Sequence, residues 1–136
     1  MLLGDEQADV RQVAIVDSRG RVAAHTGARC IREAGQRVAD GVSVQANMME
    51  RPTVPDAMLE AYRSASGDLA ERMLTALDAA EREGGDIRGR QSAALLVASA
   101  RATGQPDLDF PFDLRVDDHP DPLGELRRLV GLRRAY

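Results

Sequence analysis

The stretch from Gly84 to Val97 constrains the fold of this chain most strongly, because it joins the end of a helix to a buried strand. The pair Gly84-Gly85 ends a helical pattern, since glycine readily adopts the left-handed conformation that closes helices. Residues Gln91 to Ala100 then form the most apolar strand-like run in the chain. Polar groups at the mouth of a buried strand are common sites in α/β proteins. The stretch therefore predicts a topology and a candidate site.

Four polar residues of this stretch are candidate substrate-binding residues: Asp86, Arg88, Gln91 and Ser92. The planar guanidinium of Arg88 matches two carboxylate oxygens, and Asp86 would orient it. A purely structural interpretation is also open. In that interpretation Asp86 and Arg88 pair with each other, while Gln91 and Ser92 satisfy loop backbone.

Two further candidates lie where strands end. Residues 13–16 and 21–25, joined by a turn at 17–20, predict a hairpin with His25 at its end. Its imidazole titrates near neutral pH and can move a proton, although a hydrogen-bonded structural histidine is the alternative. The alternation in residues 42–47 predicts a strand that ends at Asn47. The Asn47 amide is suited to donate to an oxyanion or to turn the chain.

The densest group of possible metal ligands is Asp117-Asp118-His119. Two carboxylates and an imidazole can hold a divalent ion, but adjacent residues leaving a strand point to opposite sides. These three are therefore weak metal candidates, and capping or loop closure before the final helix is the favoured role. We expect no metal and no other cofactor.

The remaining pattern predicts an α+β order of elements. Thr53 and Pro55 signal a helix start, with Thr53 as its cap, and Ser64 to Gly67 divides the following helical region into two helices or one kinked helix. The other expected elements, in chain order, are the end of a helix within 2–9, a loop or distorted strand pair at 28–41, a surface loop at 103–111, a strand at 112–116 and a helix at 123–132.

Composition excludes several functional classes. The chain has no lysine, which removes lysine Schiff-base and lysine general-base chemistry. A net charge of −4 and few aromatic residues argue against a nucleic-acid partner. The lone Cys30 cannot form an intrachain disulfide, and an inert thiol is favoured over a catalytic one. Because the sequence has neither a signal-peptide pattern nor an apolar run of membrane-spanning length, we expect a cytoplasmic protein without a membrane partner.

Four motifs in order resemble a single family. They are residues 13–27, residues 43–48, the stretch that begins at Gly84, and residues 113–122. The resemblance runs from about Asp9 to Tyr136. The family is the widespread, functionally uncharacterised bacterial and archaeal family that is assigned by fold to the N-terminal-nucleophile hydrolase superfamily.

This resemblance implies an αββα four-layer sandwich and a single domain over residues 1–136. Members of the family begin with a further segment that contains the first strands, where the superfamily mechanism places a Thr, Ser or Cys nucleophile. In this chain the alignment of the motifs with the family places Met1 within a helix that precedes the first matched strand. We therefore expect an incomplete sandwich, truncated at its N-terminus, without a nucleophile. Uncovered sheet edges or apolar faces would then favour a homo-oligomer.

Three functions follow as hypotheses. In the first, the complete protein hydrolyses amides and this chain, inactive by itself, binds a small amide or carboxylate. Asn47, Arg88 and Gln91 should then surround one cleft. In the second, the chain is a non-catalytic interaction or scaffold module. The third and most distant is a metal-dependent hydrolase that uses Asp117, Asp118 and His119.

Overall fold

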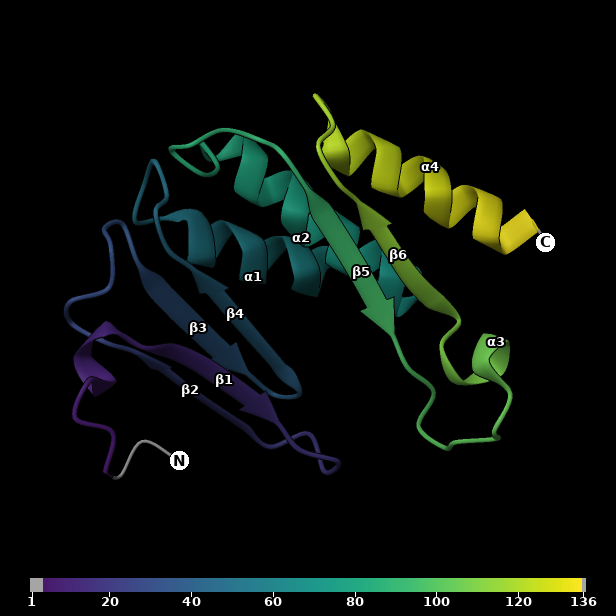
Figure 1. The fold of residues 1–136 in the computed structure, drawn as a ribbon, viewed down its shortest axis with the longest axis horizontal. Coiled ribbons are helices and arrows are strands. Elements are labelled where there is room, and N and C mark those ends of the chain that lie inside the picture. The colour runs from purple at the N-terminus through teal and green to yellow at the C-terminus, as the bar shows by residue number, and fades with distance from the viewer. Residues whose placement is uncertain (1–3, 136) are drawn as a thin grey trace.

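The computed structural model describes residues 4–135. These residues have the predicted α+β class, with three two-stranded antiparallel hairpins and four α-helices (Figure 1). The paired strands are β1 (Gln12–Val16) with β2 (Val22–Thr26), β3 (Gly35–Ala39) with β4 (Val42–Ala46), and β5 (Ala93–Val97) with β6 (Phe112–Val116). The helices are α1 (Val54–Ser64), α2 (Leu69–Arg82), α3 (Pro106–Asp109) and α4 (Pro122–Ala135), and a 3-10 helix spans Ala8–Val10.

The β3–β4 hairpin lies between two layers, because successive residues of a strand point to opposite faces. On one face, Nε2 of Gln36 donates to the carbonyl of Ala24 on β2 at 3.0 Å. On the other face, Arg37 forms a two-pronged ion pair with Asp56 of α1, with N–O distances of 2.5 and 2.7 Å. The β1–β2 hairpin therefore covers one side of β3–β4, and α1 covers the other.

A single side chain of β1 joins the two stacked hairpins. Nε2 of Gln12 donates to Oγ1 of Thr26 at 3.1 Å and to the carbonyls of Gly35 and Ala46 at 3.2 and 3.1 Å. Its Oε1 accepts a hydrogen bond from Nδ2 of Asn47 at 2.8 Å. The polar side chain thus contacts residues on β2, β3 and β4 at once.

The hydrophobic core lies where α2 and α4 pack on the β5–β6 hairpin. Leu74 of α2, Leu95 of β5 and Leu126 of α4 are fully buried in it. The next residue of β5, Leu96, is 57% exposed because it points to the opposite face. In the part of the chain that the structure describes, β5 therefore has one packed face and one uncovered face.

The helix break is confirmed, and α1 and α2 are separate helices. Gly67 has a positive φ of 100°, which glycine adopts without steric cost. Asp68 then caps α2 by accepting a hydrogen bond from the amide of Glu71 at 2.9 Å. The side chain of Asp68 also accepts two hydrogen bonds from Arg134 near the end of α4. This contact ties the start of α2 to α4.

Some local predictions are wrong. Residues 35–39, expected to be loop or a distorted strand pair, form the regular strand β3, because β4 supplies its backbone partners. Thr53 makes no side-chain cap, since its backbone is already helical, and its hydroxyl donates to Glu83 instead. Residues 106–109, expected to be loop, form the short helix α3.

At the N-terminus, the expected end of a helix is a 3-10 helix at residues 8–10. The prediction about Met1 lies outside the described residues. Among residues 4–135, no helix combines the length and the apolar character that crossing a bilayer requires.

Candidate functional site

The stretch after α2 is held in place by the glycine-rich helix end and by a neighbouring loop. Gly85, at a φ of 66°, donates its amide to the carbonyl of Ala80 at 2.9 Å and so closes α2 as predicted. The carbonyl of Gly85 accepts from the amide of Glu50, and the amide of Ile87 donates to the carbonyl of Met48, each at 2.9 Å. Residues 85–87 are therefore fixed against residues 48–50 before the chain enters β5.

Asp86 and Arg88 form a closed pair. Oδ1 of Asp86 accepts from the backbone amide and Nε of Arg88 at 2.8 and 2.9 Å, and Oδ2 accepts from a terminal guanidinium nitrogen at 2.6 Å. The side-chain hydrogen bond from Arg88 lowers the pKa of Asp86, and the same bond raises the pKa of Arg88. Both groups thus remain charged near neutral pH, and the pair has no net charge.

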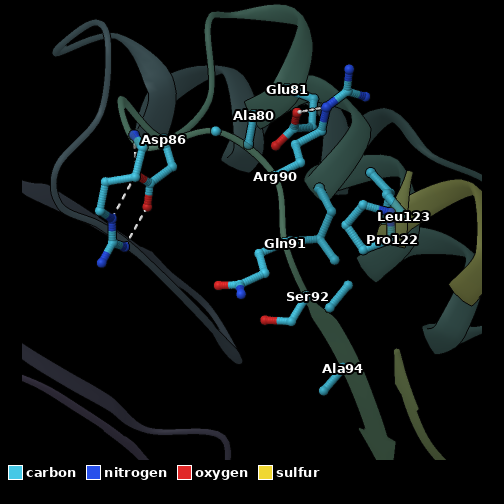
Figure 2. Close-up of a pocket in the computed structure, with 13 residues that line it drawn as sticks. Ala80, Glu81, Asp86, Arg90, Gln91, Ser92, Ala94, Pro122 and Leu123 are labelled. Carbon is cyan, nitrogen blue, oxygen red and sulfur yellow. Dashed lines mark hydrogen bonds and ion pairs between the residues drawn. The ribbon is translucent and has the colours of Figure 1, made fainter. Parts of the chain in front are cut away.

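A hollow of about 510 Å³ lies beside this pair, at the start of β5. Asp86, Arg88, Gln91 and Ser92 all line it, so the structure brings four of the predicted site residues together. In Figure 2 the Gln91 amide and the Ser92 hydroxyl point to the same side of the chain, whereas the side chain of Arg90 points away toward Glu81. Gln91 and Ser92 are exposed and line the hollow, and within residues 4–135 their side chains make no hydrogen bond to the protein, so both are open to solvent or to a ligand.

The other two predicted binding residues lie elsewhere. Asn47 does not line the hollow, and its amide donates to Gln12 between the hairpins. His25 lies on β2, where its Nε2 is 2.7 Å from the carbonyl of Ala8. Because a carbonyl only accepts, Nε2 must carry the proton in this contact. The expected group of Asn47, Arg88 and Gln91 is therefore reduced to Arg88 and Gln91.

The weak metal candidates are engaged in local contacts. Asp117 pairs with Arg115 at 3.2 Å, and Nδ1 of His119 accepts from the amide of Asp121 at 3.0 Å. Asp118 has a positive φ of 51°, as in a tight turn. In the described residues, no group of three or more His, Cys, Asp or Glu side chains is arranged to hold a metal ion.

Sequence reasoning missed part of the hollow. Arg90 lines it and lies 3.4 Å from Glu81 of α2, and Pro122 and Leu123 of α4 form an apolar side. The available signal was proximity in sequence, because Arg90 lies in the same short segment as Arg88 and Gln91. The contribution of α4 required the tertiary structure, since about thirty residues separate it from the stretch.

Comparison with known proteins identifies related sequences of unknown function. Residues 1–126 match the model of DUF1028, which is described as a family of unknown function. The crystal structure of protein SPO2555 from Silicibacter pomeroyi, also of DUF1028, is 33% identical to this chain with a TM-score of 0.79. The match covers 94% of this chain and 52% of that chain, so this chain spans about half of that structure's length. No curated protein matches this chain.

Proposed function

The chain belongs to the DUF1028 family of unknown function, and from that premise we propose that its hollow binds a small amide within an amide-hydrolysing domain. The observation that carries the proposal is the pair of unpartnered groups at the start of β5. The Gln91 amide offers both a donor and an acceptor, which is complementary to another amide. The Ser92 hydroxyl can add either kind of hydrogen bond.

The state of Arg88 favours an amide over a carboxylate. Asp86 already occupies Nε and one terminal nitrogen of its guanidinium and neutralises its charge. A carboxylate ligand would have to displace Asp86 before it could bind in the two-pronged geometry. A neutral amide makes no such demand, because Gln91 and Ser92 can bind it directly.

The geometry supports a binding role for these residues more than a catalytic one. A serine nucleophile requires an adjacent base, whereas the two carboxylates that line the hollow, Asp86 and Glu81, are paired with Arg88 and Arg90. We infer that residues 1–136 contribute to one αββα domain of the N-terminal-nucleophile type, in which the nucleophile would come from another strand. The stacking of β1–β2 on β3–β4, with helices on the outer side of β3–β4, supports this inference.

The proposal is tested by titrating the ¹⁵N-labelled chain with N-acetylglycinamide and, separately, with the carboxylate N-acetylglycine. The amide should shift the backbone signals of Gln91 and Ser92 and bind more tightly than the carboxylate. The double variant Gln91→Ala, Ser92→Ala should weaken amide binding about tenfold, since each lost hydrogen bond contributes about 0.5–1.5 kcal/mol. Gln105→Ala, on the exposed loop before α3, is the matched control and should bind as the unaltered chain does.

Tighter binding of N-acetylglycine would contradict the role assigned to the Asp86–Arg88 pair. Signal changes confined to regions outside the hollow, or an unaltered affinity in the double variant, would refute the site itself.

A further inference from the structure

The hollow at the start of β5 has an apolar side that hydrogen bonds to an amide would not use. Leu77 and Ala80 of α2 line it, together with Pro122 and Leu123 of α4. Leu77 and Ala80 are three residues apart, so both lie on one face of the helix. Within the part of the chain that the structure describes, both are only half-buried. Some of their apolar surface is therefore left for a ligand to cover.

The polar and apolar sides belong to the same hollow. Gln91 and Ser92 line it from the segment that enters β5, and Ala80 lies above them in the view of Figure 2. The hollow has a volume of about 510 Å³. Ligand pockets of about 300–1,000 Å³ are lined mainly by apolar side chains that bury the ligand, while a few polar groups fix its orientation. A bare amide group would use only the polar side of this hollow.

The charges that line the hollow balance each other. Oδ2 of Asp86 accepts from Arg88 at 2.6 Å, and Oε2 of Glu81 lies 3.4 Å from Nε of Arg90. Arg90 also reaches toward Asp121, at 3.7 Å. The lining thus contains two carboxylates and two guanidinium groups, and its net charge is zero. A charged group on the ligand would lose hydration here and would have to compete with an existing ion pair.

We propose that the amide ligand of this hollow carries an uncharged, apolar substituent, which packs on Leu77 and Ala80 while Gln91 and Ser92 bind the amide. This inference rests on the proposed function and adds a substrate class to it. The class comprises amides of aliphatic units, such as the amide of an aliphatic amino acid, in preference to amides of charged or polar units.

The test titrates the ¹⁵N-labelled chain with N-acetyl-L-leucinamide and with N-acetyl-L-asparaginamide, whose side chains have nearly the same shape and differ in polarity. The leucine amide should bind about tenfold more tightly, since removing about 55 Å² of apolar surface from water gives this factor. It should shift the backbone signals of Leu77 and Ala80 as well as those of Gln91 and Ser92. The cationic N-acetyl-L-lysinamide and the anionic α-amide of N-acetyl-L-aspartate should bind more weakly than the leucine amide, because each carries a charge.

Ala80→Arg should remove the preference for the leucine amide, because a long charged side chain then covers the apolar side of the hollow. Arginine is a good helix former, and a cation is favourable in the last turn of α2, so the variant should fold. Ala135→Arg is the matched control, because it adds the same side chain at the exposed end of α4, outside the hollow. It should keep the tenfold preference.

Equal affinities of the leucine and asparagine amides for the unaltered chain would overturn this inference. The proposed function would still stand in that case, provided that both amides shift the signals of Gln91 and Ser92. Tighter binding of either charged amide than of the leucine amide, or an unaltered preference in Ala80→Arg, would also overturn the inference. If none of these amides shifts the two signals, the site itself and both proposals are refuted.

Discussion

Gly27→Ala should destabilise the chain strongly for a purely steric reason. A Cβ at Gly27 would lie 2.2 Å from the carbonyl oxygen of Asp9 and 2.6 Å from that of Ala8. Ordinary contact begins near 3.4 Å, so the 3-10 helix and the end of β2 must separate by about 1 Å. Both obstructing atoms are backbone atoms, which cannot move aside by a change of rotamer.

The separation would strain three hydrogen bonds that join these segments. The amide of Gly27 donates to Arg11 at 2.8 Å, the amide of Arg29 to Asp9 at 2.7 Å, and the His25 ring to Ala8 at 2.7 Å. Each such bond contributes about 0.5–1.5 kcal/mol, so the expected loss in free energy of unfolding is about 2–4 kcal/mol.

Urea denaturation measures this loss, and hydrogen exchange at Arg29 reports the local opening. Gly131→Ala is the control, because its added Cβ meets nothing within 4 Å in the interior of α4. That substitution should raise stability by up to about 1 kcal/mol, since alanine is the better helix former. Equal stability of Gly27→Ala and the unaltered chain, with unchanged exchange at Arg29, would refute the steric reasoning.

Two further predictions concern charged pairs. Asp86→Asn frees the Arg88 guanidinium and should shift the binding preference from N-acetylglycinamide toward N-acetylglycine in the same titration. Asp117→Asn is the control, because it breaks the similarly spaced pair with Arg115 and should leave that preference unchanged. The hydrogen bond from the Glu71 amide, together with that from Arg134, lowers the pKa of Asp68 in the folded chain. In the unfolded chain the pKa of Asp68 is about 4. The ionised Asp68 therefore stabilises the fold above about pH 4, and this stabilisation is lost as the pH falls through the lower pKa of the folded chain. Asp68→Asn should therefore have a melting temperature that depends less steeply on pH below about 4, and identical slopes in circular dichroism melts would argue against this linkage.

The elements with strong local signals could be predicted from the sequence. Alternation identifies β4 and β6, the apolar run identifies β5, and the glycine pair after residue 83 correctly marks the end of α2. In contrast, β3 has no such pattern, because its stability comes from pairing with β4 and from contacts such as that between Arg37 and Asp56. The residues of β3 alone do not indicate these partners, which lie elsewhere in the sequence.

The candidate site could be predicted only where its residues are close in sequence. Arg88, Gln91 and Ser92 share the hollow because one short segment carries them. Asn47 ends a different strand, and its distance from that segment depends on how the hairpins are ordered. The sequence allowed Asp86 and Arg88 to pair with each other as an alternative. That Asp86 takes up two nitrogens of the Arg88 guanidinium depends on side-chain geometry, which the sequence does not show.

The contacts of Gln12 have a consequence for how the two stacked hairpins assemble. Shifting β1 by one residue against β2 would turn Gln12 outward and bring the apolar Val13 inward. The carbonyls of Gly35 and Ala46 and the amide of Asn47 would then lose their hydrogen bonds to Gln12. Apolar contacts tolerate a shift of one strand along its neighbour, whereas this set of hydrogen bonds fits one alignment only. Gln12 therefore favours the native strand register over registers shifted by one residue during folding.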